Sequence, residues 1–274
     1  MQSIGFNEDD AYLIANVGNK ISVANRYTMK KITEISGDLN NPRYIAFANG
    51  KGYVTNWGEG SDTTDDFIAV IDVATNTISS KISVAEGPEQ IIANGNTLYV
   101  THKGGWGSGN SVTVINAATN TVITSINVGA IPDELGIDNN GNILVSCEGQ
   151  AETSWNPTEV LGSLVSINSA TNEVISTLDF ASGFHPNSMV LNSGNVYLST
   201  SSSIYRMPQG ATTIPSDAII STTVSGLSVN ENRIFVTDVK DFASPGTLKI
   251  FDATTNLEVK EFTVGLIPRK IYFN

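Results

Sequence analysis

Three tryptophans recur along the chain at a constant interval, and aromatic faces of this kind suit a large flat ligand. Trp57, Trp106 and Trp155 are each 49 residues apart, and each lies in a long polar segment. Exposed aromatic rings can stack on a flat ligand, whereas a tryptophan in a loop commonly packs against that loop instead. The spacing therefore supports two interpretations, a shared aromatic rim on three equivalent repeats or three separate loop anchors.

The two histidines and a cluster of aspartates could bind metals. His102 and His185 can in principle act as metal ligands or as axial ligands of cobalt, although a hydrogen-bonded loop histidine is the more common role. Asp62, Asp65 and Asp66 are close enough in sequence to bind calcium, but their spacing fits no EF-hand loop. A solvated acidic loop is the alternative interpretation of these aspartates.

Two repeated phrases predict the strands that must position these residues. A proline opens a strand in the segments Pro42-Arg-Tyr-Ile45, Pro88-Glu-Gln-Ile91, Pro132-Asp-Glu-Leu135, Pro186-Asn-Ser-Met189 and Pro268-Arg-Lys-Ile271. Proline suits the first residue of a strand, where its missing N–H breaks no ladder hydrogen bond. The next strand carries Tyr53-Val-Thr-Asn56 and its variants, which begin at Tyr99, Leu144, Tyr197 and Phe235.

A third phrase predicts tight β-hairpins. It reads Asp72-Val-Ala-Thr-Asn-Thr77 in its first copy and recurs from Asn116, Asn168 and Asp252, each time between two alternating apolar segments. The first Asp or Asn can accept hydrogen bonds from loop N–H groups. The later Asn tolerates the left-handed conformation that closes the turn.

The period of these phrases indicates a β-propeller. The first four prolines of the strand phrase are 46, 44 and 54 residues apart, and four short strands at that period are typical of a propeller blade. Helical periodicity is absent over any useful window, so the chain is predicted to be all-β. Six complete four-stranded antiparallel blades are expected, over residues 3–39, 40–86, 87–130, 131–184, 185–224 and 225–266.

Residues 267–274 are expected to form the innermost strand of a closing blade. Propellers usually close by joining both ends of the chain in one blade. We therefore expect a seven-bladed ring in the full-length protein, with three partner strands upstream of Met1. A six-bladed ring with an extra strand is the alternative.

The meander topology gathers the long loops on one face of the ring. The post-proline residues open the innermost strands on the same face, at the mouth of the central channel, and such loops commonly carry binding sites. The candidate ligand-binding residues are Arg43, Tyr44, Trp57, Glu89, His102, Trp106, Asp133, Trp155, His185, Asp238 and Arg269. The candidate metal-binding residues are Asp62, Asp65, Asp66, Glu134 and Asn187.

Composition excludes several classes of partner. Asp and Glu outnumber Lys and Arg by 27 to 15, giving a net charge of −12, which argues against nucleic acid. No segment reaches the roughly 18 apolar residues of a membrane helix. The single cysteine, Cys147, permits no internal disulfide and is expected to be a small buried apolar residue. Most of the excess negative charge falls on the long-loop face, which favours a neutral, cationic or metal-bridged ligand.

The motifs resemble a known family. Tyr53-Val-Thr-Asn56 matches the signature of the YVTN-repeat propellers, and Tyr99-Val-Thr-His102 is a near copy. The segments 264–274, 205–215 and 233–241 are similar to a propeller family of surface and secreted proteins in Bacteroidetes. Some of its members are cell-surface lipoproteins that capture corrinoids beside a TonB-dependent outer-membrane transporter. The resemblance implies an exported protein at the cell surface, in the extracellular space or in the periplasm, whose signal peptide or lipid anchor is not in this chain.

Three functions are compatible with the sequence. The first is non-enzymatic capture of a small nutrient, with a corrinoid as the leading candidate and a TonB-dependent transporter as partner. The second is a calcium-dependent hydrolase or lactonase, because Glu89, Asp133, Glu134 and Asn187 loosely resemble the calcium-holding sets of some propeller lactonases. The third is a platform for protein–protein interaction. No cofactor is required by the sequence, and calcium is the one candidate.

Overall fold

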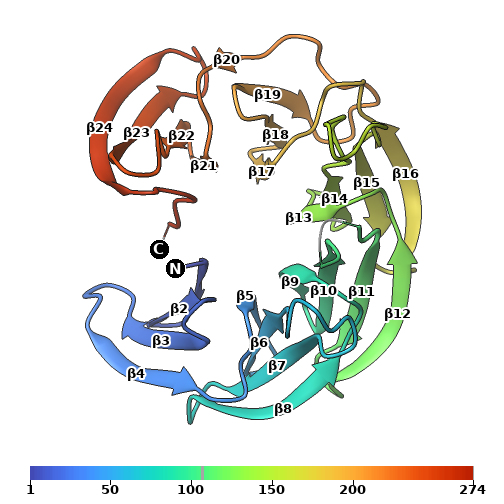
Figure 1. Cartoon of the computed structure of the whole chain (residues 1–274), viewed down its shortest axis with the longest axis vertical. Helices are drawn as coiled ribbons and strands as arrows, with labels where there is room; N and C mark the ends of the chain where they lie inside the picture. The colour runs from blue at the N-terminus through green and yellow to red at the C-terminus, as the bar shows by residue number, and fades with distance from the viewer. Residues whose placement is uncertain (106–107, 274) are drawn as a thin grey trace.

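The chain is an all-β ring, as the sequence predicts. The structure is a computed structural model that describes residues 1–105 and 108–273, and every regular element in those residues is a β-strand. The strands form six four-stranded antiparallel sheets, each hydrogen-bonded in chain order. The sheets follow one another around a central axis (Figure 1). The molecule is therefore a six-bladed β-propeller, which confirms the predicted fold class.

Each blade takes four consecutive strands and begins with its innermost strand (Figure 1). Blades 1 to 3 contain β1 (Ser3–Asn7), β2 (Asp10–Ala15), β3 (Lys20–Asn25), β4 (Lys31–Ser36), β5 (Pro42–Ala48), β6 (Lys51–Asn56), β7 (Phe67–Asp72), β8 (Thr77–Ser83), β9 (Pro88–Asn94), β10 (Thr97–His102), β11 (Ser111–Asn116) and β12 (Thr121–Asn127). Blades 4 to 6 contain β13 (Pro132–Ile137), β14 (Ile143–Cys147), β15 (Ser163–Asn168), β16 (Glu173–Asp179), β17 (Ser188–Asn192), β18 (Asn195–Ser199), β19 (Ser203–Pro208), β20 (Ile220–Ser221), β21 (Gly226–Asn230), β22 (Arg233–Asp238), β23 (Pro245–Asp252) and β24 (Glu258–Leu266).

The predicted hairpin turns are confirmed in detail. Asp72 Oδ1 accepts hydrogen bonds from the backbone N–H groups of Ala74, at 2.9 Å, and Thr75, at 3.1 Å. Asn76 adopts the left-handed conformation, with φ of 53°. The equivalent residues with positive φ are Asn120, Asn172 and Asn256. An Asx-type turn therefore closes the two outer strands in four of the six blades.

A buried tyrosine fastens each of the first three blades to the turn of the next. The Tyr53 hydroxyl of blade 2 lies 2.7 Å from the carbonyl oxygen of Ala117 and 2.9 Å from Asn120 Oδ1, both in the turn of blade 3. The equivalent pairs are Tyr12 with Asn76 and Tyr99 with Asn172. Burial raises the pKa of Tyr12 to about 12, so these hydroxyls stay protonated and can donate.

Five apolar clusters fill the spaces between consecutive blades. Representative members, one from each blade of a pair, are Tyr12 and Val54, Tyr53 and Leu98, Tyr99 and Val145, Leu164 and Leu198, and Tyr197 and Ile234. Cys147 belongs to the third cluster and is fully buried, as expected for a small apolar residue. Because buried apolar area is the main source of stability, these clusters hold the blades in their ring.

The space between blade 6 and blade 1 is built differently. Among the described residues no cluster of buried apolar side chains joins these two blades, and the interval between them is wider than the others (Figure 1). The C-terminal segment 267–273 lies in this interval. Thr237 Oγ1 donates to the carbonyl oxygen of Arg269 at 2.8 Å, and the Ser228 hydroxyl donates to that of Ile271 at 2.9 Å.

A hydrogen bond from a threonine hydroxyl to a backbone carbonyl oxygen also positions an innermost strand elsewhere in the ring. Thr55 Oγ1 donates to the carbonyl oxygen of Glu89 at 2.8 Å, across the boundary between blades 2 and 3. The segment 267–273 thus occupies the place of an innermost strand, although it forms no β-ladder. A seventh blade built on it stays a prediction. No helix in the described residues is long and apolar enough to cross a membrane.

Candidate functional site

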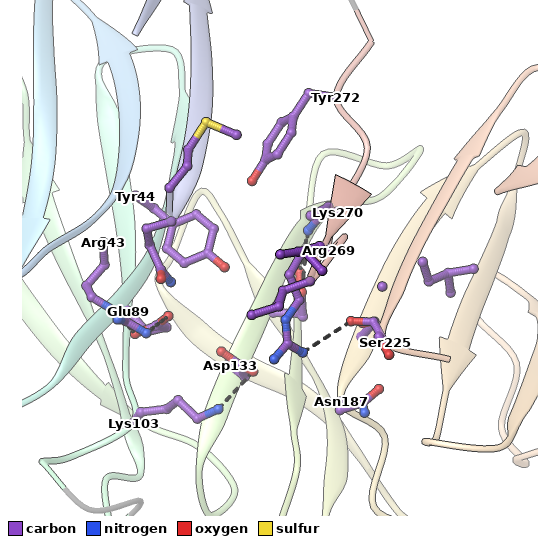
Figure 2. Close-up of a pocket in the computed structure, with 18 residues that line it drawn as sticks. Arg43, Tyr44, Glu89, Lys103, Asp133, Asn187, Ser225, Arg269, Lys270 and Tyr272 are labelled. Atoms are coloured by element: carbon purple, nitrogen blue, oxygen red, sulfur yellow. Dashed lines mark hydrogen bonds and ion pairs between the residues drawn. The ribbon is translucent and has the colours of Figure 1, made fainter. Parts of the chain in front are cut away.

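A cavity of about 580 Å³ lies in the central channel, on the face where the innermost strands begin. Its walls come from the starts of β5, β9, β13, β17 and β21 and from the C-terminal segment (Figure 2). This volume falls within the range of roughly 300–1,000 Å³ that is usual for small-molecule sites.

The proline phrases supply most of the cavity wall. The lining residues that directly follow the five prolines are Arg43, Tyr44, Glu89, Asp133, Glu134, Asn187, Ser188, Arg269 and Lys270. Consecutive residues of a regular strand point to opposite faces. In β5 and β13 the strand register shifts directly after the proline, and such a bulge re-aims side chains. The irregular strand start therefore allows both residues of one phrase to line the cavity.

Arg43 and Glu89 form a two-point ion pair at one wall. Arg43 Nε lies 2.8 Å from Glu89 Oε2, and Nη2 lies 2.9 Å from Oε1. Trp57 packs over the guanidinium with its ring centre 4.4 Å from Arg43 Cζ, and its Nε1–H donates to the carbonyl oxygen of Pro88 at 3.1 Å. Burial raises the pKa of Glu89, and Arg43 opposes that shift.

Lys103 bridges two carboxylates deeper in the channel. Its Nζ lies 2.9 Å from Asp133 Oδ2 and 3.2 Å from Glu148 Oε1. Burial, and then the neighbouring Asp133, raise the pKa of Glu148 to about 8. Burial lowers the pKa of Lys103, but Asp133 and Glu148 raise it by more, so Lys103 remains an ammonium ion.

A third ion pair crosses from the C-terminal segment to blade 4. Lys270 Nζ lies 3.1 Å from Glu134 Oε2 and 3.4 Å from Oε1. Burial raises the pKa of Glu134, and Lys270 lowers it in turn. This contact ties the C-terminal segment 267–273 to blade 4.

The remaining polar lining is less constrained. Arg269 contacts the carbonyl oxygen of Ser225 at 3.5 Å and has no carboxylate partner among the described residues. Asn187 Oδ1 accepts a hydrogen bond from the Ser199 hydroxyl at 3.2 Å. The hydroxyl group of Tyr44 points into the cavity (Figure 2). Burial raises the pKa of Tyr44 well above its ordinary value, so its phenol is neutral.

The structure does not gather the tryptophans into a rim on this cavity. Trp57 packs over Arg43 outside the lining, and Trp155 is 96% exposed. Trp106 lies outside the described residues. The aromatic-rim hypothesis is therefore not supported by the placement of Trp57 and Trp155.

The histidines have internal partners. His102 is buried, with Nε2 2.8 Å from Thr113 Oγ1 and Nδ1 3.3 Å from the Glu86 carbonyl oxygen. Burial lowers the pKa of His102 to about 4, so its ring is neutral. His185 Nδ1 lies 2.8 Å from the Glu148 carbonyl oxygen, and Nε2 lies 3.0 Å from Glu159 Oε1. Neither histidine lines the cavity.

The acidic candidates, which are the three aspartates of the 60–66 loop and the ligand-binding candidate Asp238, also have hydrogen-bond partners within the protein. Asp62 and Asp65 accept backbone hydrogen bonds within their own loop, and Asp66 accepts one from Gly87 at 2.7 Å. Asp238 caps the loop N–H of Lys240 at 2.8 Å, away from the cavity. Within residues 1–105 and 108–273, no group of three or more His, Cys, Asp or Glu side chains is placed to hold a metal ion. Glu134 and Asn187 do line the cavity.

Several lining residues were missed by the sequence analysis. Lys270 and Ser188 follow the same prolines as Arg269 and Asn187, so treating every proline phrase alike would have found them. Lys103 directly follows a central strand, and Tyr272 is the fourth residue after Pro268. No local signal marks these two as partners of residues in other blades.

Two solved structures share the fold of this chain. The hydrazine synthase of Kuenenia stuttgartiensis matches with a TM-score of 0.70 and 16% identity, over 97% of this chain and 87% of that chain. The computationally designed Ika8 protein matches with a TM-score of 0.69 and 12% identity, over 100% of this chain and 77% of that chain. These identities show the propeller fold alone. No protein-family model and no curated protein matches the sequence, so no sequence relative supports the resemblance to the YVTN-repeat or Bacteroidetes propellers.

Proposed function

We propose that the protein is a non-enzymatic binding propeller whose central cavity holds a small molecule. The observation that carries the proposal is the convergence of side chains from several blades and the C-terminal segment on one cavity. Three ion pairs fix these side chains in place before any ligand arrives. A site whose groups are already held loses less conformational entropy when it binds.

The same ion pairs favour binding over catalysis. Glu89, Asp133 and Glu134 each contact a Lys or Arg nitrogen within 3.1 Å. A carboxylate that contacts an ammonium or guanidinium group is a weaker base and a poorer calcium ligand than a free carboxylate. These contacts give the alternative of a calcium-dependent hydrolase no specific support.

The finer proposal names the ligand and the partner that the sequence resemblance implies. The ligand would be a corrinoid, and the partner would be a TonB-dependent outer-membrane transporter at the cell surface. Both rest on the motifs alone, and export of the protein is part of the same proposal.

The cavity is tested with a variant that fills it. Ser188 lines the cavity and makes no side-chain hydrogen bond in the described residues, so Ser188→Trp should occlude the site while Ser188→Ala should leave it open. Thermal unfolding and calorimetry are measured with cobalamin and a panel of small acids, amides and amines. Stabilisation of the wild-type protein and Ser188→Ala, lost in Ser188→Trp, supports the proposal.

Two results would count against the proposal. If no compound stabilises the wild-type protein, or if Ser188→Trp binds as well as Ser188→Ala, the cavity is not the site. Binding of other compounds without cobalamin removes the corrinoid and leaves the cavity site intact. Binding of cobalamin alone identifies the corrinoid as the ligand.

A further inference from the structure

We propose that the cavity holds its ligand by a carboxylate group, which Arg269 binds with Asn187 as a second donor. This inference rests on the proposed binding of a small molecule in the cavity and names a chemical class that differs from the corrinoid implied by the sequence resemblance. It is carried by the distribution of charge around the cavity and by the partners of each charged side chain.

Three of the four cationic side chains in the lining are already engaged. Arg43 is held by Glu89, Lys103 by Asp133, and Lys270 by Glu134. Arg269, the fourth, contacts a single backbone carbonyl oxygen at 3.5 Å in the described residues. That distance makes a weak hydrogen bond, so a ligand can take its place without breaking an ion pair.

The wall on the Arg269 side of the cavity carries no acids in the part of the chain that the structure describes, and Asp133, which faces Arg269 from blade 4, is already paired with Lys103. The lining residues of blades 5 and 6 and of the C-terminal segment include no Asp or Glu among the described residues. Figure 2 shows the Arg269 side chain extending into the space between Asp133, Asn187 and Ser225. Because Asn187 Oδ1 already accepts from Ser199, the amide N–H groups of Asn187 are available to donate to a ligand.

The charge balance of the lining favours a single negative charge on the ligand. Four cationic side chains face three carboxylates, Glu89, Asp133 and Glu134. Glu148 contacts Lys103 at 3.2 Å but does not belong to the lining. The side chains of the lining therefore carry one excess positive charge, which a monocarboxylate balances. This differs from the sequence expectation of a neutral, cationic or metal-bridged ligand, because most of the acids on this face lie outside the cavity.

Guanidinium geometry suits a carboxylate as well. Its parallel N–H groups match the two oxygens of a carboxylate, and such charge-assisted pairs are about twice as strong as neutral hydrogen bonds. Tyr44 and Tyr272 also line the cavity and provide aromatic surface for the body of the ligand. The ligand class is thus a small monocarboxylic acid with an apolar or hydroxylated body.

The test compares a carboxylate with its neutral amide and with a different anion. Benzoate, benzamide and inorganic phosphate are titrated by calorimetry and thermal unfolding. We expect benzoate alone to bind the wild-type protein, and Arg269→Met to weaken it at least about tenfold. Asn187→Asp should have a similar effect, because it places a carboxylate beside Arg269 while keeping the cation. Arg233→Met is the control, since Arg233 pairs with Asp252 at 2.7 Å outside the cavity.

Each outcome bears on the inference separately from the binding function. Absence of benzoate binding, unchanged binding in Arg269→Met, or equal binding of phosphate would overturn the inference. If benzamide or cobalamin binds in a manner that Ser188→Trp abolishes while no carboxylate does, the cavity function stands and the carboxylate assignment falls. If none of the compounds binds, both proposals fall.

Discussion

Each side chain of the Tyr53-Val-Thr-Asn56 phrase makes its own contact with the surrounding ring. The Tyr53 hydroxyl reaches the turn of blade 3, and Val54 is buried against blade 1. Thr55 Oγ1 donates to the Glu89 carbonyl oxygen at the start of β9. Asn56 Oδ1 accepts from the backbone N–H of the preceding connection at 3.0 Å. The phrase recurs because each blade needs the same set of contacts with its neighbours.

Removing one of these hydroxyl groups should weaken the ring measurably. Tyr53→Phe leaves the side chain of Asn120 without this donor and leaves the carbonyl oxygen of Ala117 with only the longer hydrogen bond from Asn49 Nδ2, at 3.4 Å. We expect the free energy of unfolding to fall by about 1–2 kcal/mol, measured by urea denaturation. Tyr27→Phe is the matched control, because Tyr27 is largely exposed. Equal stability of Tyr53→Phe and the wild-type protein would show that the interblade bond contributes nothing.

Glu148 should make stability depend on pH. Its pKa rises from 4.5 to about 8 in the folded protein. Between these values the folded state binds more protons than the unfolded state, so stability falls as pH rises through this window. In Glu148→Gln the fall should be shallower, as measured by unfolding temperature between about pH 6.5 and 8.

The comparison with Glu148→Gln separates this residue from the other groups that titrate. Asp66, whose pKa is raised to about 6, also makes stability fall as pH rises, but mostly below pH 6. His102, with its pKa lowered to about 4, acts in the opposite direction, and its contribution to stability is lost as pH falls from 6.5 to about 4. Both groups are unchanged in Glu148→Gln, as are the buried Glu89 and Glu134, whose pKa values are also raised, so their contributions cancel in the comparison. An unchanged slope in Glu148→Gln would contradict the assignment.

Among the structural elements, the hairpin turns allow a test of backbone and side-chain contributions. Asn120 and Asn256 both have positive φ, but only Asn120 contacts a tyrosine of the preceding blade. Replacement by Gly keeps the backbone conformation available. We therefore expect Asn256→Gly to be nearly neutral and Asn120→Gly to cost about 1 kcal/mol more, by chemical denaturation. If both variants lose the same stability, the contact between Asn120 and Tyr53 contributes nothing measurable.

Sequence patterns predict the elements better than the site they build. The Asx turns, the proline-led strands and the blade period are local, and each has a physical signature within a few residues. The ion pairs of the cavity are not local. Glu134 and Lys270 are 136 residues apart, and nothing in either segment indicates that ring closure brings them together. The tryptophan interval is regular, yet Trp57 packs over Arg43 because a cation over an aromatic ring is itself a favourable contact.

For the whole molecule, stability should be lowest at the two ends of the row of blades. Blades 2 to 5 each share an apolar cluster with two neighbours, whereas blades 1 and 6 each share one. We expect backbone amides of β1–β4 and β21–β24 to exchange hydrogen faster than those of β9–β12, measured by mass spectrometry. Uniform protection around the ring would show that the segment 267–273 couples blade 6 to blade 1 as strongly as an apolar cluster does.

The net charge of the whole molecule does not predict the charge of the cavity lining. The chain carries −12 overall, yet the cavity lining has more cationic than acidic side chains. Total charge predicts solubility and long-range attraction, while a buried site is governed by the few groups that contact the ligand. The composition therefore argues against nucleic acid as a partner but could not define the ligand.

The tyrosine contacts between blades also have a direction. In all three contacts the donor belongs to the earlier blade and the acceptor to the turn of the later one: Tyr12 to Asn76, Tyr53 to Asn120, Tyr99 to Asn172. As the chain leaves the ribosome from its N-terminus, the turns of blades 2, 3 and 4 each follow the tyrosine that they contact. For these blades we therefore expect the order of assembly to follow the order of synthesis.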